Sequence, residues 1–340
     1  MGELGPVVVD LGSGLTKLGQ AGDEEGPRVL PSVIGVPKFK SLGNNAKSRA
    51  FCDEAQLHVG VFDFEYPVQK GVFDKELTGG YLDYLIQYEL RRDPKENPFL
   101  FSCHPRCPFS NKVQLAELMF EKEKCEYLGL VMEPILNAFV AGTETALLYS
   151  SGAGVTHVSA IYDGFLIKNS ITRVQRGGDE VTGYLRKLLA NEGHYFGNDS
   201  SESFLMNSIK HSCSTANTNP NTCPKERNTF TLPDGKQIEI GPAGWQCVES
   251  IFDPSVTGSQ SYGIAELIIN AINSCPIDIR AQLAKNIVLC GGNTKFPGFD
   301  ERLMLELNKY RTTATRMGQK LNSSPAMYHL QPAKIIGTWE

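Results

Sequence analysis

Residues 7–17 read VVVDLGSGLTK, and residues 146–157 read ALLYSSGAGVTH. Each stretch is a short apolar run that stops at a Gly-x-Gly turn, which is typical of a buried strand entering a tight turn. Polar and apolar residues follow each turn in the pattern of a returning strand. The repetition of this strand–turn–strand unit predicts two related halves that mix strands and helices.

The two copies differ in their acidic and hydroxyl side chains. When the paired glycines are aligned, Asp10 corresponds to Ser150, and Ser13 corresponds to Ala153. The second copy therefore lacks the carboxylate of the first, and this asymmetry bears directly on function.

The composition is that of an ordinary globular protein. The 340 residues, 41% hydrophobic and 21% charged, predict two domains or one large bilobal unit. The net charge of −5, spread along the chain, disfavours nucleic acid or a membrane surface as the main partner. We expect no membrane span and no signal peptide, because no long apolar segment or basic leader is visible.

The cysteines predict a reducing compartment. There are nine, an odd number without a regular framework, so reduced thiols in the cytosol or nucleus are expected. Cys103 and Cys107 flank His104, but a metal site would need two further ligands at matching spacing, and the sequence offers none.

Hydrophobic periodicity predicts the elements of each half. The first half is expected to contain strands at 6–10 and 97–103, helices at 77–90 and 113–122, and a basic, aperiodic loop at 38–51. The second half is expected to contain a helix at 181–193 that ends at Gly193, a hairpin at 229–240, helices at 265–274 and 299–310, and a strand at 286–292.

A strand–Gly-x-Gly–strand turn exposes main-chain N–H groups and allows close approach of a ligand, so it suits phosphate oxygens. A single copy more often serves shape alone, whereas two copies facing each other across a cleft would clamp a polyphosphate. Lys17 would add a positive charge, and Asp10 would need a partner such as hydrated Mg²⁺. The sequence contains no P-loop and no helix-opening G-x-G-x-x-G.

The sequence strongly resembles actin over nearly its whole length and in the same order. The matching motifs are VVVDLGSGLTKLGQAGDEEGPRVLPSVIGVPK (7–38), CDEAQ (52–56), EYPVQKG (65–71), GVTHVSAIYDG (154–164), LPDGKQIEI (232–240) and NIVLCGGNTKFPG (286–298). On these motifs it is identified as a divergent actin-related protein of the actin–Hsp70–sugar kinase fold, not a conventional actin. The resemblance implies an α/β actin-like ATPase fold with two related lobes around a central nucleotide cleft.

The resemblance also implies the domain boundaries. The first lobe would span 1–141, with a small insert at about 31–66 that includes a segment similar to the D-loop by which actin grips the next subunit. The second lobe would span 142–340, with an insert at about 178–262. The sequence stops where the family continues into a glycine turn and a final helical region, which is therefore expected to be missing: either this protein is truncated relative to actin, or its tail is not included in the sequence.

By the same resemblance, the ligands would be ATP or ADP and Mg²⁺. Asp10 would hold the metal through water. Residues on the first turn would hold the phosphates from one side, namely Gly12, Ser13, Gly14, Leu15 and Lys17. Residues on the second turn would hold them from the other side, namely Gly152, Ala153, Gly154 and Val155. The adenosine would be received by Gly291, Gly292, Asn293, Phe296 and Lys210.

Three departures from actin concern hydrolysis. Actin has aspartates at the positions of Ser150 and Ala153, where they face the hydrated metal and the attacking water. Actin's water-orienting glutamine is matched by Glu133, the candidate catalytic residue; a glutamate here resembles Hsp70 and the sugar kinases, where it assists hydrolysis or metal binding. Because phosphoryl transfer depends on placing water and metal, we expect negligible hydrolysis with retained binding.

The segments that correspond to actin's filament contacts are polar. The D-loop-like stretch 38–51 is basic, and FDPSVTGSQS (252–261) replaces an apolar plug. Interfaces need buried anchors, so self-polymerisation is not expected unless another chemistry has replaced these contacts.

Three functions remain open from sequence. The first is a structural subunit of a cytoskeletal or chromatin-associated assembly, with protein partners and a cytoplasmic, cytoskeleton-associated or nuclear location. The second is a polymerising actin-like ATPase. The third is a small-molecule kinase or chaperone-type ATPase that uses Glu133 as its acid–base residue; it ranks last because no substrate loop or peptide-binding domain is visible.

Overall fold

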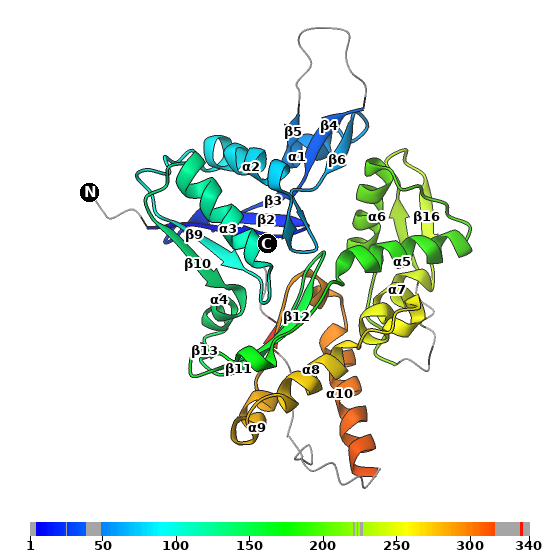
Figure 1. Ribbon diagram of the computed structural model, residues 1–340. Coiled ribbons are helices and arrows are strands. Elements are labelled where there is room, and N and C mark those ends of the chain that lie inside the picture. Colours follow the sequence, from blue (N-terminus) through cyan, green and yellow to red (C-terminus); the bar gives the residue numbers. More distant parts are fainter. Residues whose placement is uncertain are drawn as a thin grey trace. The chain divides into compact units, whose positions relative to one another are not determined.

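The computed structural model describes residues 5–24, 26–38, 49–219, 222, 224, 227–316 and 334–335. The chain divides into two compact units (Figure 1). The first unit extends to Glu133 and includes Asp199–Ser201, and the second comprises Pro134–Asn198 and the described residues from Glu202 to Ile335. The lobe boundaries expected from the sequence stay a prediction.

The first unit is built on a five-stranded sheet of order β10-β9-β1-β2-β3. Strand β9 runs parallel to β1 and β10, whereas β2 is antiparallel to β1 and β3. The side chains of β1 alternate between buried and half-buried, as expected for a strand whose faces differ in environment. The strands are β1 (Val7–Leu11), β2 (Leu15–Gln20), β3 (Arg28–Pro31), β9 (Phe99–Cys103) and β10 (Leu128–Met132).

Helices and two smaller sheets complete the first unit. One small sheet has the order β5-β4-β6, and β7 pairs with β8. Helices α2 and α3 each continue into a π-helical turn, at Leu85–Leu90 and Leu118–Lys122. The bounds are β4 (Ile34–Pro37), β5 (Ala50–Phe51), β6 (Phe62–Glu65), β7 (Val68–Gln69), β8 (Val72–Phe73), α1 (Cys52–Leu57), α2 (Lys75–Tyr84) and α3 (Phe109–Glu117).

The second unit repeats the sheet of the first. Its strand order is β13-β12-β11-β17-β18, with β14 also paired to β12. Strand β17 runs parallel to β11 and β18, and β12 is antiparallel to β11 and β13, as in the first sheet. The strands are β11 (Ala146–Ser151), β12 (Thr156–Tyr162), β13 (Phe165–Leu166), β14 (Thr172–Val174), β17 (Ile287–Cys290) and β18 (Lys334–Ile335). The duplication predicted from the twin turns is therefore present in the topology.

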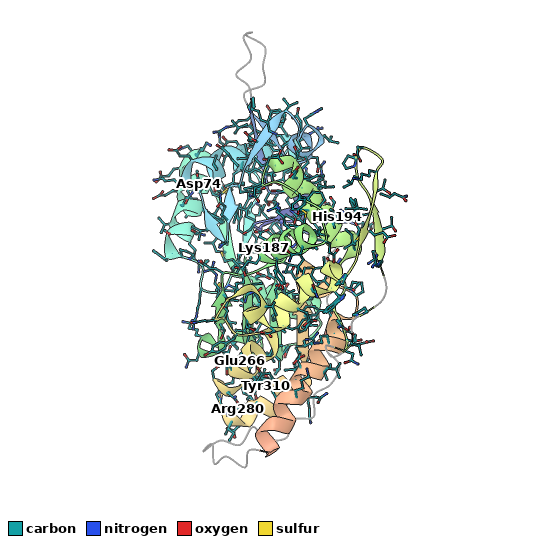
Figure 2. The ribbon with its side chains drawn as sticks, turned by 90° about the vertical axis from the view of Figure 1, so that its right-hand side faces the viewer. Asp74, Lys187, His194, Glu266, Arg280 and Tyr310 are labelled. Carbon is teal, nitrogen blue, oxygen red and sulfur yellow. The ribbon has the colours of Figure 1, made fainter. Side chains whose placement is uncertain are left out.

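The remaining elements of the second unit are mostly helical. Helix α4 (Glu133–Val140) begins at the division between the units. The others are α5 (Gly178–Asn191), α6 (Ser200–Cys213), α7 (Ala243–Phe252), α8 (Ile264–Asn273), α9 (Ile277–Lys285), α10 (Phe299–Arg316) and the hairpin β15 (Asn228–Thr231) and β16 (Gln237–Ile240). Figure 2 labels Glu266 on α8 and Tyr310 on α10, two helices that pack into one core.

Each unit has its own hydrophobic core. Phe99, Phe101 and Tyr81 are fully buried in the first, and Tyr149 and Phe299 are fully buried in the second. Since burial of such side chains is the main favourable term in folding, each unit has an independent source of stability.

Most elements predicted from periodicity are confirmed. Gly193 follows α5 with a φ of +91°, and the predicted hairpin turns at Gly235, whose φ is +84°. Most of the basic stretch 38–51, the end of the chain and one of the nine cysteines lie outside the described residues. The eight cysteines within them are free thiols. In this part of the chain, no helix is both long and apolar enough to cross a membrane.

Candidate functional site

The first glycine turn joins β1 to β2. The connecting loop consists of Gly12, Ser13 and Gly14, and Leu15 begins β2; the first residues paired across the turn are Leu11 and Thr16. A Cβ on Gly12 would lie 2.5 Å from the carbonyl oxygen of Leu15, so the closed turn requires glycine there. The hydroxyl of Ser13 accepts a hydrogen bond from the amide of Gly71 at 3.1 Å, which ties the turn to the β7–β8 connection.

Asp10, the predicted metal residue, is held by two neighbours in the first unit. Its Oδ2 lies 3.1 Å from the ammonium of Lys17, and its Oδ1 accepts a hydrogen bond from the Ser102 hydroxyl. A carboxylate has about four lone-pair sites, so these contacts leave acceptor capacity for water. The Asp10 side chain is 28% exposed, which suits a metal such as Mg²⁺ that keeps most of its waters. The residues therefore fit the expected ion.

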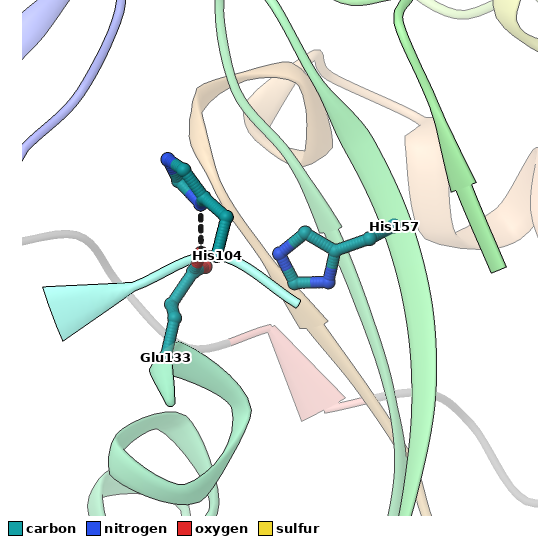
Figure 3. Close-up of side chains that lie close together, drawn as sticks. All are labelled: His104, Glu133 and His157. Carbon is teal, nitrogen blue, oxygen red and sulfur yellow. Dashed lines mark hydrogen bonds and ion pairs between the residues drawn. The ribbon is translucent and has the colours of Figure 1, made fainter. Parts of the chain in front are cut away.

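Glu133 forms a close pair with His104, a contact that the sequence did not indicate. Glu133 opens α4, and its Oε2 lies 2.6 Å from Nδ1 of His104 (Figure 3). An acid in the first turn of a helix is favoured by the helix dipole, which is a structural reason for a glutamate here. Its side chain is 17% exposed, and that of His104 is 23% exposed.

The second glycine turn has the same register as the first. Ser151 pairs with Thr156, so the loop consists of Gly152, Ala153, Gly154 and Val155. The Gly152 amide donates to the Val155 carbonyl at 3.0 Å and closes the turn. This loop lies against the start of α5, because the carbonyl oxygens of Gly152 and Ala153 accept hydrogen bonds from the amides of Gly178 and Asp179, both at 2.9 Å.

Close packing fixes the second turn from two further directions. A Cβ on Gly177 would overlap the carbonyl oxygens of Gly152 and Ala153. On the other side, the Asn293 amide donates at 2.9 Å to the Ser151 hydroxyl and at 2.9 Å to the Gly152 carbonyl. The turn is thus pre-organised by contacts within the second unit.

The positions that carry aspartates in actin present no carboxylate here. Ser150 is buried on β11, and its register partner on β12 is His157, which is also buried and is drawn in Figure 3. Ala153 is half-buried at the tip of the turn. Neither side chain has a charge with which to hold metal-bound water or accept a proton.

Several residues predicted to receive adenosine lie in the interior of the second unit. Lys210 is 5% exposed, and its ammonium donates to the Gly178 carbonyl, the Thr182 hydroxyl and the Asn207 amide oxygen at 2.9–3.1 Å. Burial lowers its pKa, although nearby Asp179 opposes this effect. Phe296 belongs to the core. Gly292 is exposed, and a Cβ there would meet no atom within 4 Å.

The structure therefore gathers the predicted residues into two groups, one in each unit. In the first, Asp10, Lys17 and the first turn lie together. In the second, the turn, Asn293 and Lys210 lie against Gly178 at the start of α5, and Gly291 packs against the main chain of Ser151. From the sequence, His104 was considered only with its flanking cysteines as a metal site, and Ser102 and the pair Gly177–Gly178 were not identified. The glycine pair just before a predicted helix was a visible signal.

The topology defines a class: α/β proteins made of two equivalent sheets, each with a glycine turn between its first two strands. The family model of Actin matches residues 1–339, so the chain belongs to the actin family and has its α/β fold. Members of this family generally bind ATP or ADP with Mg²⁺.

Proposed function

We propose that this chain is a divergent actin-related protein that binds ATP or ADP with Mg²⁺, hydrolyses it little or not at all, and serves as a fixed structural subunit of a larger assembly. The observation that carries the proposal is the asymmetry of the twin turns. Both keep their glycines and register, but the second has Ser150 and Ala153 in place of acids.

Retained binding is supported by the main chain of both turns. The grip of a glycine turn on phosphate comes from backbone amides, which substitutions at Ser150 and Ala153 leave in place. The first turn is closed around Gly12, and the second is held by α5 and Asn293. Lys17 and Asp10 supply charges of both signs beside the first turn.

Slow hydrolysis is supported by the missing carboxylates. Groups that place and deprotonate the attacking water commonly contribute about 10²- to 10⁴-fold in rate. Ser150 and Ala153 supply no such group, and Glu133 is engaged by His104.

A role in an assembly, without actin-like filaments, is supported by the segment that replaces actin's plug. Phe252 at its start is buried, and Asp253 accepts hydrogen bonds from the amide and hydroxyl of Ser255 at 3.0 and 2.6 Å. The segment continues as a polar turn, with Ser259 bonded to Ser261. We propose protein partners, and a cytoplasmic, cytoskeleton-associated or nuclear location; the net charge of −5 gives no basis for binding nucleic acid.

The proposal is tested by the nucleotide content and the single-turnover rate of the purified protein. We expect stoichiometric ATP or ADP after denaturation, and little phosphate release by the parent chain. The double variant Ser150→Asp, Ala153→Asp is expected to release phosphate about tenfold faster or more. The matched variant Ser150→Asn, Ala153→Asn tests whether charge, rather than size, causes the change.

Other results would select the alternatives. Assembly of the parent chain with salt and ATP, together with phosphate release, would favour a polymerising ATPase. Turnover stimulated by a sugar or peptide would favour a kinase or chaperone-type ATPase. An empty protein that gains no stability from added nucleotide would contradict nucleotide binding itself.

A further inference from the structure

Three adjacent parallel strands of the first unit end in polar residues at the same edge of the sheet. Asp10 lies near the end of β1, His104 follows β9, and Glu133 follows β10. Cys103 pairs with Met132 in register, so the residues that follow them leave the sheet side by side. The carboxyl edge of parallel strands is where α/β folds place their ligands. His104 therefore belongs to the same edge as the predicted site residues.

The pair of His104 and Glu133 is held on ordered supports. The main-chain carbonyl of His104 accepts a hydrogen bond from the Cys107 amide at 3.2 Å, which closes the turn after β9. Glu133 is fixed by the first turn of α4, and buried Pro134 follows it. Because both backbones are constrained, the contact between the side chains needs little reorganisation.

The contact has a defined direction. An ionised carboxylate only accepts hydrogen bonds, so Nδ1 of His104 carries the hydrogen and donates to Oε2 of Glu133. The separation of 2.6 Å is at the short end for a charge-assisted hydrogen bond. In Figure 3 the other ring nitrogen of His104 lies on the side away from Glu133.

We propose that His104 is a positioning residue that holds the Glu133 carboxylate and withdraws it from activation of the attacking water. This inference rests on the proposed function, because it concerns the slow turnover of bound nucleotide. A hydrogen bond to the ionised form stabilises a carboxylate and lowers the basicity of the whole group, so Glu133 is a weaker acceptor for the proton of water even through its other oxygen, and its orientation is set by the donor. His104 thus adds to the effect of the missing aspartates.

The main test compares single-turnover phosphate release among variants of the full chain. His104→Ala removes the donor and is expected to raise the rate by about tenfold. His104→Asn retains an amide donor near the position of Nδ1 and is expected to keep the parental rate. The gain should disappear in the double variant His104→Ala, Glu133→Gln, because the released group would be absent. A misfolded variant would not release phosphate faster than the parent chain, so a higher rate in His104→Ala supports the inference directly.

A second measurement does not depend on turnover. In the ADP-bound protein, ¹⁵N NMR of the imidazole groups should show His104 protonated at Nδ1, with a downfield proton resonance that shifts in Glu133→Gln. An unprotonated Nδ1 would overturn the inference, and so would an unchanged or lower rate in a His104→Ala protein that retains nucleotide. If the parent chain bound no nucleotide, the proposed function would be contradicted. Failure of the proposed function is therefore distinguishable from failure of the inference about His104.

Discussion

Gly291 and Gly292 are adjacent in the chain, but only Gly291 has a backbone conformation and a close contact that require glycine. Gly291 has φ of +87° and ψ of 160°, a conformation that is essentially restricted to glycine, and a Cβ there would overlap the main chain of Ser151. We expect Gly291→Ala to destabilise the second unit by about 2 to 4 kcal/mol, from backbone strain and overlap together. The free energy of unfolding is measured in urea from the fluorescence of Trp245. A Trp339→Phe background leaves Trp245 as the only tryptophan.

The adjacent glycine provides the control. Gly292 has an exposed, unhindered Cβ position, so Gly292→Ala should change the free energy of unfolding by less than about 0.5 kcal/mol. Equal losses in both variants would show that the region responds to any substitution, and would contradict the conformational argument.

The glycine turns were predictable from the sequence because their requirement is local. His104 was not recognised as part of the site, since its partner Glu133 lies 29 positions away and meets it only through the pairing of β9 with β10. Lys210 stays a predicted contact of the adenosine, and the fold supplies its ammonium with three protein acceptors that the sequence did not indicate. A sequence shows which side chain can donate, but not which acceptors the fold supplies.

At the scale of elements, the start of α5 determines where the second turn lies. Gly177 precedes this helix and approaches the turn so closely that a Cβ would overlap two of its carbonyl oxygens. We expect Gly177→Ala to displace the turn, to destabilise the second unit by about 1 to 3 kcal/mol, and to weaken nucleotide binding. Calorimetric titration with ADP and urea unfolding measure the two effects.

Gly183, inside α5, distinguishes the effect of helix propensity from that of close approach. Gly183 lies inside the helix with no atom within 4 Å of its Cβ position, so Gly183→Ala should stabilise by about 0.5 to 1 kcal/mol. Wild-type affinity for ADP in Gly177→Ala would show that the turn does not depend on this contact.

A buried ion pair joins α10 to α7. The Arg302 guanidinium is 4% exposed and donates to both carboxylate oxygens of Glu249, at 2.5 and 2.8 Å. Neutralising Glu249 leaves the buried guanidinium with one carboxylate, that of Glu306 at 2.9 Å, and a buried charge that loses part of its compensation destabilises the fold. We therefore expect Glu249→Gln to destabilise the second unit by about 2 to 3 kcal/mol in urea unfolding.

The exposed pair of Arg227 and Glu239 is the matched control. Both side chains are about two-thirds exposed, at 67% and 66%, so Glu239→Gln should change stability by less than about 0.5 kcal/mol. A loss in Glu249→Gln as small as in this control would mean that the buried pair contributes no net stability.

Helices were predicted well where their buried positions are all apolar, and poorly where a polar residue interrupts the apolar spacing. Helix α8 has an almost wholly apolar buried face, and its range was predicted closely. Helix α6 buries Met206, Ile209, Lys210 and Cys213, which have helical spacing, but the buried lysine hides the pattern. The π-helical turns after α2 and α3 were not predicted, because the apolar spacing of five or six residues does not distinguish them from α-helix.

At the scale of the whole molecule, the two units have the same strand order but separate cores. Separate cores allow separate unfolding, whereas a ligand bound by both would couple their stabilities. We expect two calorimetric transitions after nucleotide is removed with EDTA and apyrase. With Mg²⁺ present and ADP at a hundred times its dissociation constant, linkage predicts that the free energy of unfolding rises by about 2.7 kcal/mol. The two transitions should then merge into one at a higher temperature.

The variant Lys17→Met separates phosphate recognition from a general effect of Mg²⁺ or ionic strength. Lys17 lies in the first unit, where its ammonium contacts Asp10, and its loss should reduce the nucleotide-induced shift in both transitions. If ADP raised only one transition, the nucleotide would contact one unit and could not link the two. If the nucleotide-free protein already unfolded in a single transition, the units would be coupled by their own contacts, and nucleotide would not be needed as a structural element between them.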